Sequence, residues 1–112
     1  MKELRRAIKH LIDEEWIRAN EVHNPFINAH EAAAVIREEI EEAKDALDKI
    51  EVHYEAFWQE VKGDEFGQMA DDLERIYKWA QLAACECVQV GAMAEKALLL
   101  IYNTMEEMKE EK

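Results

Sequence analysis

The sequence predicts an all-α protein, a bundle of three or four helices with one long central helix, and three observations support this fold class. The 112 residues include only three glycines and one proline, too few turn residues for a β protein of this length. Apolar residues make up 49% of the chain, enough to build a core. Apolar side chains also recur at steps of three and four residues, the period of an amphipathic helix. The length fits a single domain, residues 1–112.

The first predicted helix covers residues 3–22. Its apolar positions are Leu4, Ile8, Leu11, Ile12, Ala19 and Val22. Asn24-Pro25 ends it, because proline lacks a backbone N–H and disfavours helical geometry in the preceding residue.

The long central helix is predicted over residues 29–62. Asn28 can cap its start, and Glu31 follows three residues later, as in a capping box. Nothing interrupts the pattern before Gly63, which gives a helix of about 48 Å. Its apolar stripe alternates steps of four and three: Ile36, Ile40, Ala43, Leu47, Ile50, Tyr54, Phe57 and Val61. This stripe exceeds what one small bundle covers, which favours a homo-oligomer, a dimer or tetramer.

A turn at 63–67 and a third helical stretch over residues 68–103 complete the predicted fold. The segment Leu82–Ala94 is apolar on nearly every side, so we expect it to be buried. The charged tail after Asn103 is expected to fray.

The charge balance excludes two classes of partner. Twenty-six acidic against 14 basic residues give a net charge of −12, which argues against binding nucleic acid or an anionic membrane. The longest apolar run, Ala97–Tyr102, is far too short to span a bilayer.

Cys85 and Cys87 point to opposite sides of a helix and cannot bridge each other. These features predict a reduced, cytoplasmic protein.

A run of glutamates in the central helix, EEIEE at 38–42, is the first candidate site. Residues three and four apart are neighbours on a helix, so Glu38 and Glu39 both lie next to Glu42. Glu39 and Glu42 share the flank that adjoins the apolar stripe. A solvated acidic face is the alternative interpretation.

A lone acid in the apolar segment 82–94 is the second candidate. Glu86 and Gln89 are its polar residues, and they project side by side. A buried carboxylate is costly unless it is paired or binds a cation. The alternative is a structural glutamate paired with a lysine or arginine of another helix. Glu39 and Glu42 facing Glu86 would offer the oxygen ligands that suit Mg²⁺ or Mn²⁺.

Residues 23–101 resemble the MazG-like all-α nucleoside triphosphate pyrophosphohydrolases, in particular their phage- and prophage-type branch. The family's first motif, EExxE, is matched by Glu38, Glu39 and Glu42, preceded by Asn24-Pro25-Phe26 and His30-Glu31. The second motif, ExxD, is replaced in that branch by Glu-x-x-Gln, which the segment 86–94, ECVQVGAMA, matches with Glu86 and Gln89.

The chain departs from the family pattern in two respects. The separation of Glu42 and Glu86 is longer than the usual family gap, and Gln89 stands in place of the motif's aspartate. A competing alignment uses the segment 68–71, QMAD, and puts Asp71 in the second motif, but it lacks the motif's glutamate. We prefer Glu86 because its apolar surroundings suit a buried ligand.

The resemblance implies hydrolysis of a nucleoside triphosphate to a monophosphate and pyrophosphate, a nucleotide-housecleaning reaction. It implies a Mg²⁺ site, with Mn²⁺ as the alternative ion, and its ligands would be Glu38, Glu39, Glu42, Glu86 and Gln89. Glu38 or Glu39 would orient or deprotonate the attacking water.

Two further residues are candidates for contact with the substrate. Lys96 lies nearly three turns past Glu86 on nearly the same side and could contact a phosphate, with a surface lysine as the alternative. His30 is the histidine closest to the acidic run. The alternative function is a non-catalytic helical oligomer or partner-binding module, in which Glu86 is a paired buried charge.

Overall fold

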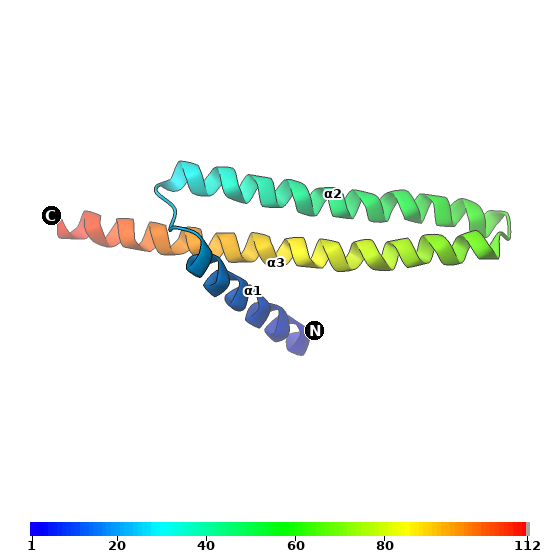
Figure 1. The fold of residues 1–112 in the computed structure, drawn as a ribbon, viewed down its shortest axis with the longest axis horizontal. Helices are drawn as coiled ribbons and strands as arrows, with labels where there is room; N and C mark the ends of the chain where they lie inside the picture. The colour runs from blue at the N-terminus through cyan, green and yellow to red at the C-terminus, as the bar shows by residue number, and fades with distance from the viewer. Residues whose placement is uncertain (112) are drawn as a thin grey trace. The chain divides into compact units, whose positions relative to one another are not determined.

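The computed structural model describes residues 1–111, and these form three α-helices and no strand. Helix α1 spans Lys2–Val22, α2 spans Ala29–Lys62 and α3 spans Phe66–Glu110 (Figure 1). The all-α prediction is therefore confirmed over the described residues. None of the three helices is both long enough and apolar enough to cross a membrane.

Local signals in the sequence account for the ends of α1 and the start of α2. The Oδ1 atom of Asn28 accepts a hydrogen bond from the backbone N–H of Glu31 at 2.9 Å, which satisfies one of the donors left free in the first helical turn. His23 is extended after the last turn of α1, and its N–H donates to the carbonyl of Ala19 at 2.8 Å. The chain then enters Asn24-Pro25, where a helix cannot continue.

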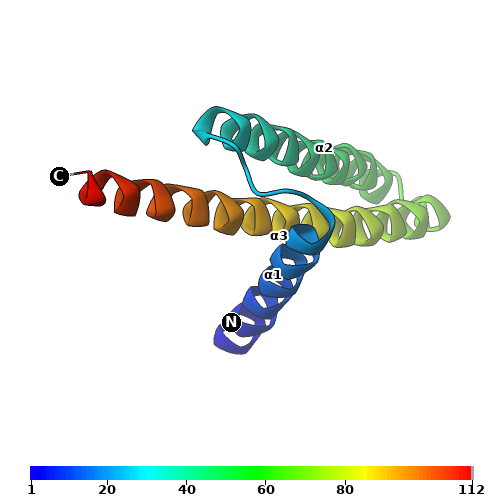
Figure 2. The ribbon, with the colours of Figure 1, turned by 60° about the vertical axis from the view of Figure 1, so that its left-hand side comes forward.

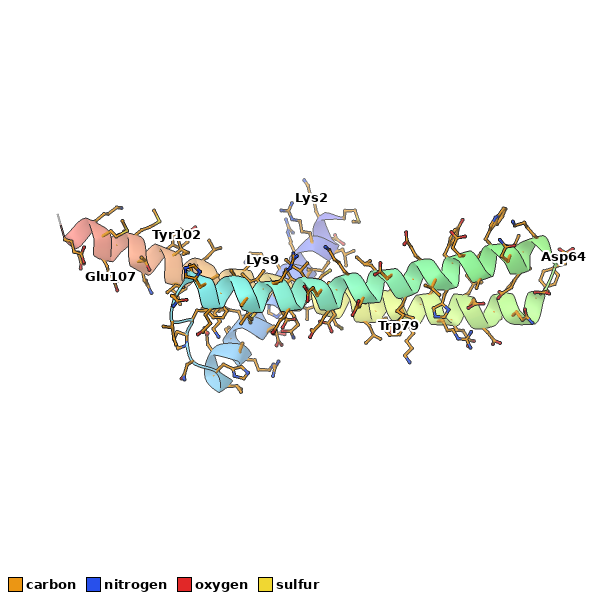
Figure 3. All side chains as sticks on the ribbon, turned by 90° about the horizontal axis from the view of Figure 1, so that it is seen from above. Lys2, Lys9, Asp64, Trp79, Tyr102 and Glu107 are labelled. Carbon is orange, nitrogen blue, oxygen red and sulfur yellow. The ribbon has the colours of Figure 1, made fainter. Side chains whose placement is uncertain are left out.

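Helix α3 is longer at both ends than the sequence predicts. The turn occupies only residues 63–65, because Asp64 adopts the left-handed conformation with φ 54° and reverses the chain (Figure 3). Gly67 therefore lies inside the first turn of α3. At the other end, the predicted fraying after Asn103 is wrong, since α3 continues to Glu110. Thr104 donates to the carbonyl of Leu100 at 2.8 Å, and Lys109 bonds to Glu106 at 3.4 Å.

The chain divides into two compact units, and α2 and α3 each contribute to both. The hairpin unit is Ile40–Glu86, in which α2 and α3 run antiparallel, side by side (Figures 1 and 3). Its buried apolar residues are alanines, Ala43, Ala46 and Ala83, which allow two helices to approach closely. Leu47 and Tyr54 of the predicted stripe are 52% and 51% exposed, because two helices alone do not cover the whole stripe.

The three-helix unit consists of Met1–Glu39 with Cys87–Lys112. Its core is formed by Ala19, Phe26, Ala32, Ala92 and Met93. Helix α1 crosses α3 (Figure 2) and packs tightly against it at Gly91, where a Cβ atom would lie 2.7 Å from Cδ1 of Ile12. Only glycine permits this approach without a shift of the isoleucine.

The expectation that Leu82–Ala94 is buried on every side is wrong for the chain as described. Ala83, Ala92 and Met93 are buried, but Leu82 is 39% exposed. Cys85 and Cys87 are also exposed, and both are free thiols. The described helices cover only part of the circumference of α3 in this segment, so its remaining apolar side chains face outward.

Candidate functional site

Two glutamates predicted to meet across the fold do so within the hairpin unit. Glu42 lies on α2 and is exposed, whereas Glu86 lies on α3 and is partly buried. The pKa of Glu86 is raised, first by burial and then by its hydrogen bond with Glu42 and the negative charge of that neighbour. A protonated Glu86 that donates to Glu42 is one way to relieve the repulsion, and a bound cation is another.

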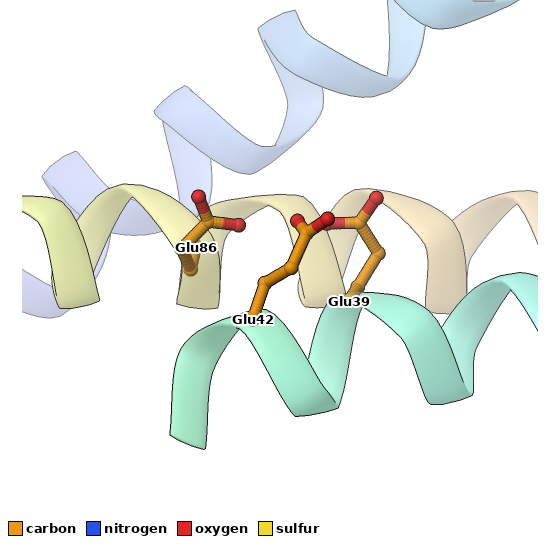
Figure 4. Close-up of side chains that lie close together, drawn as sticks. All are labelled: Glu39, Glu42 and Glu86. Atoms are coloured by element: carbon orange, nitrogen blue, oxygen red, sulfur yellow. The ribbon is translucent and has the colours of Figure 1, made fainter. Parts of the chain in front are cut away.

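Glu39 lies one turn before Glu42 on the same unbroken helix, so the helix itself sets their relative placement. One carboxylate oxygen from each of Glu39, Glu42 and Glu86 lies within 4.8 Å of the others (Figure 4). Carboxylate oxygens are the ligands that Mg²⁺ and Mn²⁺ prefer. The donor set and the raised pKa of Glu86 both fit a divalent cation at this position.

Three other proposed ligands lie outside this group of carboxylates. Glu38 is exposed, since it is rotated by about 100° from Glu39 around the helix axis. The side chain of Gln89 instead hydrogen-bonds Glu15 of α1. Arg18 and then Gln89 together hold the pKa of Glu15 below its usual value. Asp71 is exposed and borders a shallow hollow with Glu74, Arg75 and Lys78.

A pocket of about 530 Å³ lies within the three-helix unit. Helix α1, the 23–27 connection, the start of α2 and the adjoining part of α3 all contribute to its wall. Its polar lining residues are Glu15, Arg18, His23, Asn24, Glu31, Glu39, Gln89 and Lys96. Glu39 therefore belongs both to the carboxylate group and to the wall of this pocket.

Lys96, which the sequence indicated as a candidate phosphate contact, is one of the basic residues that line the pocket. The surface-lysine alternative is wrong, since Lys96 is only 7% exposed. Its Nζ lies 4.4 Å from the centre of the Phe26 ring, a cation–π distance. Among residues 1–111 it makes no ion pair. An unpaired cation in the wall of a cavity can receive an anionic ligand group.

His30 does not join this arrangement. It is exposed in the first helical turn of α2 and is not among the residues that line the pocket. The histidine that lines the pocket is His23, in the connection between α1 and α2. Helical spacing could not identify His23, because it lies outside any helix.

A second acidic pair in the hairpin unit was missed by the sequence reasoning. Glu60 and Asp72 are 8% and 5% exposed and share a hydrogen bond. His53 Nδ1 lies 3.0 Å from Asp72 Oδ1, and Arg75 Nη1 donates to the same oxygen at 3.4 Å. The bond to Asp72, burial, and nearby negative charges raise the pKa of Glu60 to about 7. The available signal was the three-residue steps from Ile50 to His53 and from Phe57 to Glu60, which put both polar residues beside the apolar stripe.

Comparison with protein-family models, curated proteins and solved structures finds no match to this chain.

Proposed function

We propose that the chain is a Mg²⁺-dependent nucleoside triphosphate pyrophosphohydrolase of the MazG-like all-α type, which releases a monophosphate and pyrophosphate. The observation that carries the proposal is the convergence of Glu39, Glu42 and Glu86. Glu39 also borders the pocket whose wall includes Lys96, so one of the three carboxylates and a buried cation line the same cavity. Binding of a nucleotide polyphosphate needs a metal ion at the phosphates and a second cation for the negative charge that the metal leaves uncompensated.

Each residue has a defined role in this proposal. Glu39, Glu42 and Glu86 would hold the ion, Mg²⁺ or alternatively Mn²⁺, which when bound neutralises negative charge on the phosphates. Glu39 also reaches the pocket and would orient the attacking water and accept its proton. Lys96 would contact a phosphate oxygen through its ammonium group. Glu38 is exposed and would act on the ion only through intervening water. Gln89 would position Glu15 instead of binding the ion.

The proposal also covers the setting of the reaction. We infer a cytoplasmic nucleotide-housecleaning enzyme that acts on free nucleotides, because a net charge of −12 disfavours contact with nucleic acid. A four-helix, MazG-like bundle would need helices from a second copy, since residues 1–111 of one chain supply three. A homo-oligomer, a dimer or a tetramer, is therefore part of the proposal.

A second candidate function rests on a different observation. Large apolar side chains are exposed on all three helices, Leu11, Leu47 and Leu98 among them. A non-catalytic oligomer or partner-binding module would use such surfaces and would need no metal. Under this alternative, Glu42 and Glu86 would form a proton-sharing pair of structural importance.

The decisive experiment is pyrophosphate release from a panel of ribo- and deoxyribonucleoside triphosphates with Mg²⁺ or Mn²⁺. We expect release from at least one nucleotide, and a fall of about a hundredfold or more in Glu39→Gln. The matched control is Glu51→Gln, an exposed glutamate farther along α2, which should retain full activity. Release that survives in Glu39→Gln, or no release from any nucleotide, would refute the proposed role.

A further inference from the structure

The first half of α1 concentrates positive charge in an acidic chain. Four of the 14 basic residues lie within the first nine positions: Lys2, Arg5, Arg6 and Lys9. Lys9 is paired with Asp13 at 2.9 Å. Within residues 1–111 the other three make no ion pair, and Glu3 is the only acidic residue between positions 2 and 9.

The same half-helix presents apolar side chains between these cations. Leu4, Ile8 and Leu11 follow steps of four and three residues and are 53%, 39% and 49% exposed. The cations also border a hollow of about 610 Å³, whose other lining residues are Ile8, Ile12 and Glu95 of α3 (Figure 3 marks Lys2 and Lys9). We name this surface, residues 2–12 of α1, the basic face. Its stripe Leu4, Ile8 and Leu11 has the spacing of a helix seam and is left exposed within residues 1–111, whereas Ile12 packs against α3 at Gly91.

The last turns of α3 have the opposite character. Leu98, Ile101, Met105 and Met108 follow steps of three, four and three residues and are 40% to 61% exposed. Within the three-helix unit this part of α3 extends past the start of α2 (Figures 1 and 2), and residues 101–111 are all exposed. Four acidic residues accompany the stripe, Glu106, Glu107, Glu110 and Glu111, with one basic residue, Lys109, which pairs with Glu106 at 3.4 Å. We name residues 98–111 the acidic face.

We propose that the basic face of one copy of this chain packs against the acidic face of a second copy. Each face carries an apolar stripe that the described part of its own chain leaves exposed, and burial of these stripes against each other removes apolar surface from water. Their charges are complementary, whereas two basic faces or two acidic faces would place like charges together. In a two-fold symmetric dimer the contact forms twice, because each copy has both faces.

This inference does not depend on the hydrolase proposal, because neither face includes Glu39, Glu42 or Glu86. An inactive protein that dimerises in this way would leave the interface standing. An active protein that stays monomeric would remove the interface and the homo-oligomer expected above, and would leave the proposed hydrolysis at Glu39, Glu42 and Glu86 standing.

The test is a charge swap in the full chain, read by analytical ultracentrifugation at low ionic strength. One variant is Arg5→Glu with Arg6→Glu, and the other is Glu107→Lys with Glu110→Lys. We expect each alone to raise the dimer dissociation constant about tenfold or more, since each now sets like charges across the contact. An equimolar mixture should restore the dimer, because in the mixed dimer both contacts are again complementary.

Controls separate the interface from folding and from other occupants. Glu51→Lys with Glu55→Lys makes the same charge change as Glu107→Lys with Glu110→Lys, but on an exposed part of α2, and should leave dimerisation unchanged. Circular dichroism should show equal helix content in all variants. Wild-type association should also weaken from about 0.05 to 0.5 M salt. A monomeric wild type, a mixture that fails to associate, or a monomer that binds vesicles containing phosphatidylserine through the basic face would overturn the proposal.

Discussion

The ammonium of Lys96 lies 4.4 Å from the centre of the Phe26 ring, and both side chains are buried in the three-helix unit. The ring face stabilises the cation by roughly 0.5–2 kcal/mol. This is less than the cost of taking an ammonium out of water without a counter-charge. Burial of Lys96 without a counter-charge among the described residues therefore lowers the free energy of unfolding and leaves its ammonium able to bind an anion.

Replacement of that lysine should separate stability from binding. Lys96→Met keeps the apolar stem and removes the charge, so we expect an unchanged or higher melting temperature. The KM for the nucleotide should rise about tenfold, the equivalent of one charge-assisted hydrogen bond. Lys78→Met, at an exposed position of α3, is the control and should alter neither property. A large loss of stability with unchanged KM would show that Lys96 is structural.

Binding of a divalent cation should be visible without any substrate. A ligand of the folded state raises stability by mass action, by about 2.7 kcal/mol at a hundredfold excess over its dissociation constant. We expect Mg²⁺ to raise the melting temperature of the wild type, and Glu86→Gln to abolish that rise with nearly intact helix content. Differential scanning fluorimetry across a Mg²⁺ titration measures both, with Glu51→Gln as the control. Survival of the shift in Glu86→Gln would remove Glu86 from the ligand set.

The acidic pair in the hairpin unit predicts a pH dependence of stability. The pKa of Glu60 is about 7 in the folded chain, above its ordinary value of 4.5. Between these two pH values the folded state holds a proton on Glu60 that the unfolded state has lost. Stability from this group is complete below about pH 4.5 and declines as the pH rises toward 7. Asp72 has a lowered pKa and contributes in the opposite sense, but only below its ordinary value of 3.8.

Glu60→Gln should therefore be more stable than the wild type at pH 8, with a difference that shrinks toward zero near pH 5. Urea denaturation at several pH values measures this, and Glu55→Gln, an exposed neighbour on α2, is the control. Equal curves for wild type and Glu60→Gln across this range would mean that Glu60 titrates normally.

Two glycines of α3 should respond differently to replacement by alanine. At Gly91 a Cβ atom would meet Cδ1 of Ile12 at 2.7 Å and Cγ1 at 3.0 Å. Overpacking of this kind costs about 1–3 kcal/mol, against a gain of about 1 kcal/mol in helix propensity. Gly91→Ala should thus lower the free energy of unfolding or leave it level. At Gly67 nothing lies within 4 Å, so Gly67→Ala should raise it by up to about 1 kcal/mol. A gain at Gly91 equal to that at Gly67 would contradict the close approach of α1 to α3.

The sequence predicts the helices best where a local signal marks their ends. Asn28 and Gly63 bracket α2, and both limits agree with the prediction. The start of α3 differs because Asp64, a residue without an obligatory turn role, takes the left-handed position, which leaves Gly67 free to join the helix. The end of α3 differs because exposed charged residues do not by themselves break a helix, and Glu106 with Lys109 is a favourable pair.

The candidate site could likewise be predicted only in part from the sequence. Helical period alone places Glu39 beside Glu42, and the cost of a lone acid in an apolar run selects Glu86. Period cannot tell that Gln89 meets Glu15, because this depends on how α1 crosses α3. Nor can it pair Glu60 with Asp72, since that match depends on the register of α2 against α3, which the three-residue turn sets.

The turn at 63–65 also determines which residue of α2 lies opposite which residue of α3 in the hairpin unit. The arm 43–62 and the arm 66–85 hold the same number of residues, and this equality is what brings Glu42 opposite Glu86. Loss of one residue from one arm would rotate its glutamate by about 100° and displace it by about 1.5 Å. Addition of about seven residues to both arms would preserve the facing pair. Descendants of this chain can therefore vary the distance from site to turn, provided that they change both arms together and in steps of about two helical turns.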